Sequence, residues 1–143
     1  MTPLPPHAYV PGRTARHPED AFDALRATAV AGMDIRQLSS SDAWRAGGDF
    51  AAAGYYWEAH EVWEPVWLAC PPNSAEALAV RGAIQLVNAA LKARMGRERA
   101  ARRLVDAASG LFAEAARRAA DPRFALSADL RSTLEGVAQD YAV

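Results

Sequence analysis

The chain has 143 residues, 51% of them hydrophobic, which is enough for one domain with a single core and too little for two. Its formal net charge of -1 excludes the strong basic field that draws proteins to nucleic acids or anionic lipids. Its one cysteine, Cys70, cannot form an internal disulfide, and no signal-peptide pattern or long uncharged apolar run is present. We therefore expect a cytoplasmic protein that binds neither nucleic acid nor membrane.

The first 18 residues are rich in proline and also contain Gly12, His7 and His17. Proline lacks a backbone N–H and disfavours the helix interior, so this stretch predicts an extended arm. We expect residues 1–18 to form that arm, either draped over the domain or mobile, and residues 19–143 to form a single helical domain.

Apolar residues that recur every three or four positions predict helices in the rest of the chain, and no segment alternates as a strand does. The predicted helices cover residues 19–32, 41–50, 55–67, 73–95, 97–119 and 127–137. Serines are expected to cap the second and the last, and Asn73 with Glu76 predicts a capping box for the fourth. Pro65 is expected to interrupt the third. The fold class is therefore all-α, a bundle of about five or six mostly antiparallel helices.

Residues 55–67, YYWEAHEVWEPVW, concentrate charged and aromatic side chains in one helix. His60, Glu61 and Glu64 fall within an arc of roughly 100° that also holds Trp57 and Leu68. Burying such groups costs several kcal/mol unless they are paired, so this pattern predicts either a buried polar network or a site. Glu58 lies about 160° from His60 around the helix, and we expect it to be a solvent-facing partner for another segment of the chain.

Two interpretations of this cluster remain open from the residues alone. His60 and Glu64 could hold a divalent metal, because His-Glu-x-x-Glu resembles the zinc motif His-Glu-x-x-His, and His7 or His17 could complete the site. In the other interpretation, Glu61 or Glu64 accepts hydrogen bonds from Trp or Tyr side chains and pairs with Arg81 or His60, which locks two helices together.

The helix predicted over residues 73–95 is apolar on most of its surface and has one polar stripe of Arg81, Gln85, Asn88 and Lys92. This stripe is either a solvent face or the opposite wall of a polar cleft. The arginine-rich helix that follows carries acids four residues from Arg102 and Arg118, which predicts ion-paired solvent faces rather than a nucleic-acid patch.

The segment Gly54-Tyr55-Tyr56-Trp57-Glu58-Ala59-His60-Glu61 with Glu64 and Trp67, then Gly82, Ile84, Gln85 and Gly96, resembles domain-of-unknown-function family 309 over about residues 40–119. That resemblance implies a helical bundle with a Glu-Ala-His-Glu signature and implies no established activity. It also implies that His60, Glu61, Glu64 and Gln85 occupy the family's site positions and that Trp67 belongs to the core.

These observations support two functional hypotheses. In the first, the protein is a cytosolic binding or interaction module that recognises a small ligand or forms a homo-oligomer, with no cofactor. In the second, it is a small metal-dependent hydrolase or ligand-binding enzyme in which Glu61 and His60 are catalytic and a divalent metal is held by His60 and Glu64. The candidate ligand-binding residues are Glu64, Gln85, Arg81, Asn88, Trp57 and His17.

Overall fold

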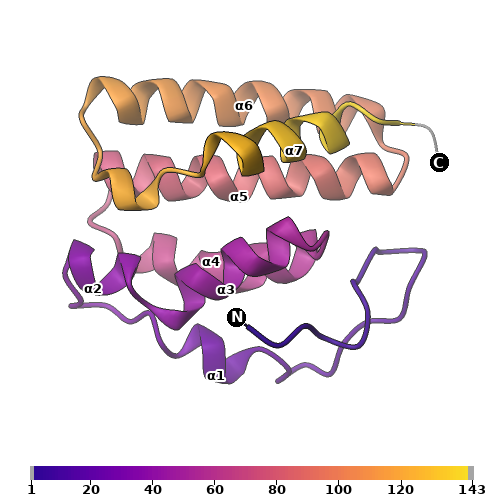
Figure 1. Ribbon diagram of the computed structural model, residues 1–143, viewed down its shortest axis with the longest axis horizontal. Coiled ribbons are helices and arrows are strands. Elements are labelled where there is room, and N and C mark those ends of the chain that lie inside the picture. Colours follow the sequence, from indigo (N-terminus) through magenta and orange to yellow (C-terminus); the bar gives the residue numbers. More distant parts are fainter. Residues whose placement is uncertain (1, 142–143) are drawn as a thin grey trace.

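The structure, a computed structural model that describes residues 2–141, is an all-α bundle (Figure 1). Its helices are α1 (Asp23–Arg26), α2 (Ile35–Ser39), α3 (Asp42–Ala52), α4 (Tyr56–Ala69), α5 (Ala75–Arg94), α6 (Glu98–Arg117) and α7 (Ala128–Ala138), with a short 3-10 helix at Pro122–Phe124. No strand is assigned within the described residues. The predicted fold class is confirmed.

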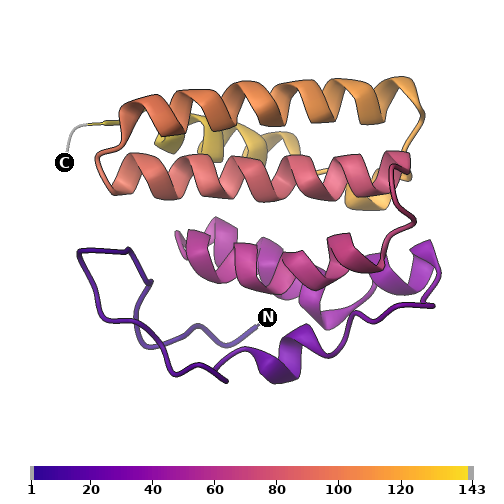
Figure 2. The same cartoon turned by 180° about the vertical axis from the view of Figure 1, so that it is seen from behind.

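The helices pack as two groups that share a core. Helices α5, α6 and α7 lie together, and α3 and α4 pack beneath α5 (Figures 1 and 2). Residues 2–22, which we call the N-terminal segment, and α1 lie mostly on the side of the α3–α4 pair that faces away from α5, and α2 lies at one end of this pair. Helix α4 is therefore covered on both sides, by α5 on one and by the N-terminal segment on the other.

Two glycines allow neighbouring elements to approach closely. A Cβ atom built on Gly47 of α3 would lie 2.0 Å from Nε1 of Trp63 in α4, and one on Gly82 of α5 would lie 2.8 Å from the ring of Phe112 in α6. Nε1 of Trp63, fully buried, donates a hydrogen bond to the Trp44 carbonyl at 3.0 Å. This contact fixes the position of α4 against α3.

Most predicted helix boundaries are confirmed. Ser41 caps α3 by accepting from the Trp44 amide, and Ser127 caps α7 by accepting from the Leu130 amide. The capping box expected at Asn73 is wrong, because Ser74 caps α5 instead and Asn73 adopts a positive φ of 60°. A capping box does occur at α2, between Asp34 and Gln37.

The helix predicted over residues 19–32 is reduced to α1, Asp23–Arg26. Thr28 explains part of this difference. Its hydroxyl donates to the Leu25 carbonyl and accepts from the Ala43 amide at 2.9 Å. These side-chain hydrogen bonds compete with the backbone hydrogen bonds that would continue the helix. Gly32, with φ of 93°, then turns the chain toward α2.

The interruption expected at Pro65 is also wrong, because α4 continues through this residue to Ala69. Within the described residues, no helix has the length and apolar character needed to cross a membrane.

Candidate functional site

His60, Glu61 and Glu64 form a charged cluster on α4 together with Arg26, the last residue of α1. His60 Nδ1 and Nε2 lie 3.6 Å from Glu61 Oε1 and from Glu64 Oε2, respectively. Arg26 places Nη1 3.6 Å from Glu61 Oε2 and Nη2 3.3 Å from Glu64 Oε1. The four side chains are between 25% and 39% exposed, so the cluster is half-buried.

Pro65 explains why Arg26 docks at this point of α4. A proline has no N–H to donate to the carbonyl four residues earlier, which here belongs to Glu61. Arg26 Nη1 donates to that carbonyl oxygen. The proline therefore leaves a backbone acceptor free on α4, and the guanidinium of Arg26 satisfies this acceptor and both carboxylates.

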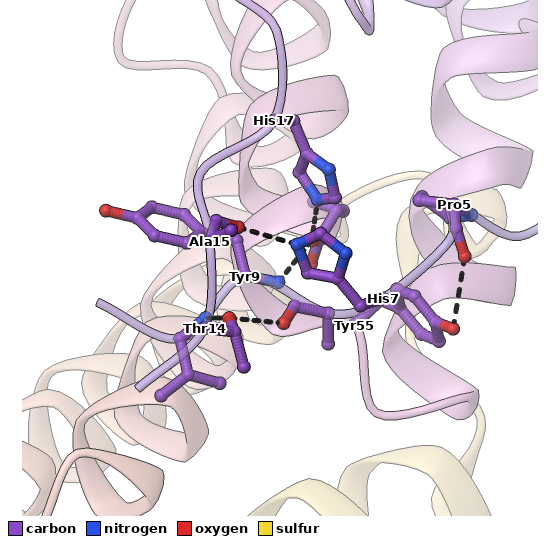
Figure 3. Close-up of polar contacts among 10 residues, drawn as sticks. Pro5, His7, Tyr9, Thr14, Ala15, His17 and Tyr55 are labelled. Carbon is purple, nitrogen blue, oxygen red and sulfur yellow. Dashed lines mark hydrogen bonds and ion pairs between the residues drawn. The ribbon is translucent and has the colours of Figure 1, made fainter. Parts of the chain in front are cut away.

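Glu58 is the largest departure from expectation, because its side chain is fully buried rather than facing solvent. Its Oε2 accepts a hydrogen bond from the Tyr9 amide at 2.7 Å and lies 2.6 Å from Nε2 of His17 (Figure 3). Its Oε1 is the one fully buried side-chain nitrogen or oxygen in residues 2–141 that lacks a hydrogen-bond partner. The helical angle was right, but the N-terminal segment covers the face on which Glu58 lies.

His17 is surrounded by aromatic rings and is 8% exposed. The ring centroids around it belong to His7 at 4.8 Å, Phe22 at 5.4 Å, Trp57 at 6.1 Å and Tyr9 at 6.5 Å. His7 stacks on His17 and directs its own Nε2 to the Ala15 carbonyl (Figure 3). His17 is thereby held between earlier residues of the N-terminal segment, His7 and Tyr9, and Trp57 of α4.

The two nitrogens of His17 have different surroundings. Glu58 Oε2 already acts as an acceptor toward the Tyr9 amide, so the contact at Nε2 is best satisfied when Nε2 carries a hydrogen and donates it. Nδ1 has no hydrogen-bond partner among the described residues. Unlike Oε1 of Glu58, it is not among the fully buried atoms that lack a partner. With the hydrogen on Nε2, Nδ1 carries a lone pair and can accept a hydrogen bond.

His17 lines a pocket of about 240 Å³ that opens between the N-terminal segment, α1 and α4. Its lining comprises Arg16, His17, Pro18, Glu19, Phe22, Asp23, Arg26, Trp57 and Glu61. The pocket brings together three of the residues singled out from the sequence, Glu61, Trp57 and His17. It is smaller than the pockets that usually hold drug-sized molecules, and it suits a compact ligand.

The polar stripe of α5 does not join this site. Arg81 is exposed and lines a separate apolar pocket near Leu68 and Cys70. Gln85 and Asn88 are half-buried, and neither makes a hydrogen bond or ion pair with the charged cluster in residues 2–141. Arg26, rather than Arg81, is thus the cation that pairs with Glu61 and Glu64.

The remaining candidates fill the core or its edge. Trp67 packs against the core while remaining partly exposed, consistent with the position that the family resemblance implied. Cys70 follows α4 as a buried free thiol, and burial, followed by the nearby carboxylate of Glu76, raises its pKa to about 11. A thiol with so high a pKa is largely unreactive near neutral pH.

No group of three or more His, Cys, Asp or Glu side chains within residues 2–141 is arranged to hold a metal ion. His17 pairs with Glu58 and not with the cluster of His60, Glu61 and Glu64. The third ligand that the metal hypothesis required is therefore directed elsewhere. Arg26 supplies to the two carboxylates the positive charge that a metal would otherwise provide.

Sequence reasoning missed Glu58, Arg26 and Tyr9 as parts of the site. Glu58 carried one usable signal, since it directly follows Trp57 in the helix that concentrates charged and aromatic side chains. Tyr9 contributes through its backbone amide and Arg26 through a long-range contact, and neither leaves a pattern in the sequence.

Comparison with known proteins bears on the family alone. The family model described as "Domain of unknown function (DUF309)" matches residues 44–104. This segment runs from α3 into the start of α6 and includes Glu58, His60, Glu61 and Glu64, whereas His17 and Arg26 precede it. No curated protein and no solved structure gives a significant match.

Proposed function

Because the description of the family model that matches residues 44–104 names no activity, we propose a function from geometry. The protein is a helical binding module that holds a small ligand in the pocket between its N-terminal segment and α4. The observation that carries this proposal is the pocket itself, in which Trp57 and Glu61 of the family segment meet His17 and Arg26 from outside it.

In this function the charged cluster forms a wall of the pocket and fixes the packing of α1 on α4. Arg26 contacts Glu61, Glu64 and the Glu61 carbonyl, so its guanidinium is almost fully engaged before any ligand arrives. Such pre-organisation lowers the entropy cost of binding because the wall does not need to be ordered by the ligand.

The second candidate is a small hydrolase in which Glu61 is the general base and His60 and Glu64 hold a cation. It is favoured by the half-exposed carboxylate of Glu61, which lines the pocket. It also requires that a metal displace Arg26 from two ion pairs. The binding module needs no such rearrangement and is therefore the function we put first.

We place this module in the cytoplasm, where the lone thiol of Cys70 stays reduced. A homo-oligomer remains part of the proposal, since Leu68 at the end of α4 is 64% exposed next to the partly exposed Trp67. Analytical ultracentrifugation of the wild type and of Leu68→Ser measures this directly. An unchanged monomer in both would remove self-association from the proposal.

The binding function is tested by amide NMR spectra of the full chain titrated with a panel of small cations, anions and neutral compounds. A ligand of the pocket is expected to shift signals of residues 16–26 and 57–61, and Glu61→Gln is expected to weaken its binding. The control is Glu98→Gln, which removes an exposed carboxylate on α6. A panel that shifts no signal in these two stretches would contradict the proposal.

The enzyme alternative has a separate readout. Elemental mass spectrometry after equilibration with zinc, manganese and iron measures bound metal in the wild type and in His60→Ala. A stoichiometric ion that is lost in the variant would favour the hydrolase, because the binding module holds no metal at His60.

A further inference from the structure

We propose that the ligand of this pocket is a small organic amine, bound as a cation that donates an N–H to Nδ1 of His17. This inference rests on the proposed binding function and names its ligand class. Three independent features of the site carry it: the charge around the pocket, the hydrogen-bonding state of His17 and the aromatic wall.

The charge around the pocket is negative. Glu19, Asp23 and Glu61 line it, and Glu64 adjoins it through Arg26, against the two guanidiniums of Arg16 and Arg26. The three carboxylates and two guanidiniums that line the pocket leave a surplus of one negative charge, to which the neighbouring Glu64 adds.

The surplus is available to a ligand. Arg26 is shared between two carboxylates and a backbone carbonyl, so it has little capacity left for an anion. Glu19 and Asp23 are exposed at the rim and form no ion pair within residues 2–141. Arg16 offsets one of these rim charges, and the balance still favours a cation.

His17 presents a hydrogen-bond acceptor rather than a donor. When Nε2 of His17 carries the hydrogen that is donated to the buried carboxylate of Glu58, Nδ1 carries a lone pair. An ammonium group carries only donors and matches this atom, whereas a carboxylate ligand would place lone pair against lone pair. This acceptor belongs to a buried histidine that is held by a buried carboxylate, and an ordinary cluster of surface acids contains no such group.

Trp57 completes the recognition. Its ring lies beside His17 and lines the same pocket. The face of an indole attracts a cation through its quadrupole, and it covers the methylene groups of an alkyl amine. The volume of about 240 Å³ limits the ligand to a short chain or a single ring.

The test uses three compounds of equal length and different charge: 1,4-diaminobutane, succinate and 1,4-butanediol. Each is titrated into the full-length protein at low salt, followed by amide NMR and by the ¹⁵N shifts of the histidine rings. The amine is expected to bind alone, to shift residues 16–26 and 57–61, and to change the Nδ1 shift of His17 more than any ring shift of His60.

The matched variants test the charge argument without disturbing buried groups. Replacing both rim acids, Glu19→Gln with Asp23→Asn, is expected to weaken amine binding about tenfold, because two exposed attractive charges are lost. Glu98→Gln with Glu135→Gln removes an exposed acid from α6 and a partly exposed acid from α7, both outside the pocket, and is expected to leave the affinity unchanged.

Each other result overturns the inference. Binding of succinate or 1,4-butanediol at the same residues would exclude the amine class while keeping the proposed binding function. Equal weakening by both double variants would show that the amine responds only to overall charge. If no compound of this set shifts these residues, the amine class is wrong, and the binding function also fails if the wider panel gives the same result.

Discussion

Glu58 shows how much one buried carboxylate can depend on residues far away in the chain. It is fully buried, and its two contacts come from Tyr9 and His17, 49 and 41 positions earlier. Transfer of an isolated carboxylate from water into a protein interior is strongly unfavourable, so the charge persists there only with such partners. The stability of α4 and the placement of the N-terminal segment are therefore linked through a single side chain.

Two adjacent glycines of α3 provide a matched test of close packing at the residue level. In Gly47→Ala the new methyl group would meet the Trp63 indole at 2.0 Å, so α3 and α4 must move apart. Overpacking of this kind is expected to lower the free energy of unfolding by about 1–3 kcal/mol. Urea denaturation followed by circular dichroism measures the change.

Gly48→Ala is the control, because its methyl group would have no atom within 4 Å. An alanine in a helix interior is expected to raise the free energy of unfolding by about 0.5–1 kcal/mol. Equal effects of the two substitutions would show that Trp63 does not approach α3 as closely as described.

At the level of elements, a proline inside a helix determines where a neighbouring element docks. Pro65 does not end α4, although it removes the donor for the Glu61 carbonyl. Arg26 of α1 then donates to this carbonyl and pairs with Glu61 and Glu64. Pro65, from which we predicted a break in the helix, thus leaves a backbone carbonyl on α4 to which Arg26 of α1 binds.

A double-mutant cycle on Arg26 and Pro65 tests this coupling. Arg26→Met leaves the Glu61 carbonyl without a donor and is expected to lower the free energy of unfolding by about 1–2 kcal/mol. In a Pro65→Ala background the alanine N–H can bond that carbonyl, so the loss on removing Arg26 should be smaller by about 1 kcal/mol. Strictly additive effects would contradict a role for the proline.

At the level of the whole molecule, the N-terminal segment is tied to the α3–α4 pair at separated points. The Thr2 amide donates to Asp49 of α3, and the Tyr55 hydroxyl donates to the Pro5 carbonyl at 3.3 Å. The Tyr9 amide adds a third contact at Glu58. These contacts hold the segment over α4, and residues 16–19 of the same segment line one side of the pocket.

Acid is expected to weaken this attachment at Asp49. The hydrogen bond from the Thr2 amide, which outweighs partial burial, lowers the pKa of this carboxylate below its ordinary value of 3.8. The contribution of Asp49 to stability is then complete above the unfolded-state pKa and is lost as the pH falls through the lower folded-state pKa. The midpoint temperature of thermal unfolding of the wild type should therefore fall as the pH is lowered through that acidic range.

Asp49→Asn removes this part of the acid dependence, and the Thr2 amide signal should no longer move with pH in NMR spectra. Asp106→Asn, which changes an exposed carboxylate on α6, should leave the wild-type slope intact. An unchanged slope in Asp49→Asn would show that the Thr2 contact does not contribute to stability.

The sequence by itself determined the features that depend on neighbouring residues. Helix periodicity and serine caps gave the bundle and the starts of α3 and α7, and four-residue spacing gave the pairs of Glu98 with Arg102 and of Glu114 with Arg118. The proximity of His60 to Glu64 followed from the same spacing. Such interactions are fixed by helix geometry, which is the same wherever the helix lies in the molecule.

Only the tertiary structure decided which surfaces meet. Periodicity placed Glu58 opposite His60, but whether that face meets water depends on the path of the N-terminal segment, which covers it. The partner of Glu61 and Glu64 is likewise Arg26 rather than Arg81, because α1 and not the polar stripe of α5 docks on the charged cluster. Long-range contacts reflect the packing of the whole chain, and no local pattern in the sequence encodes them.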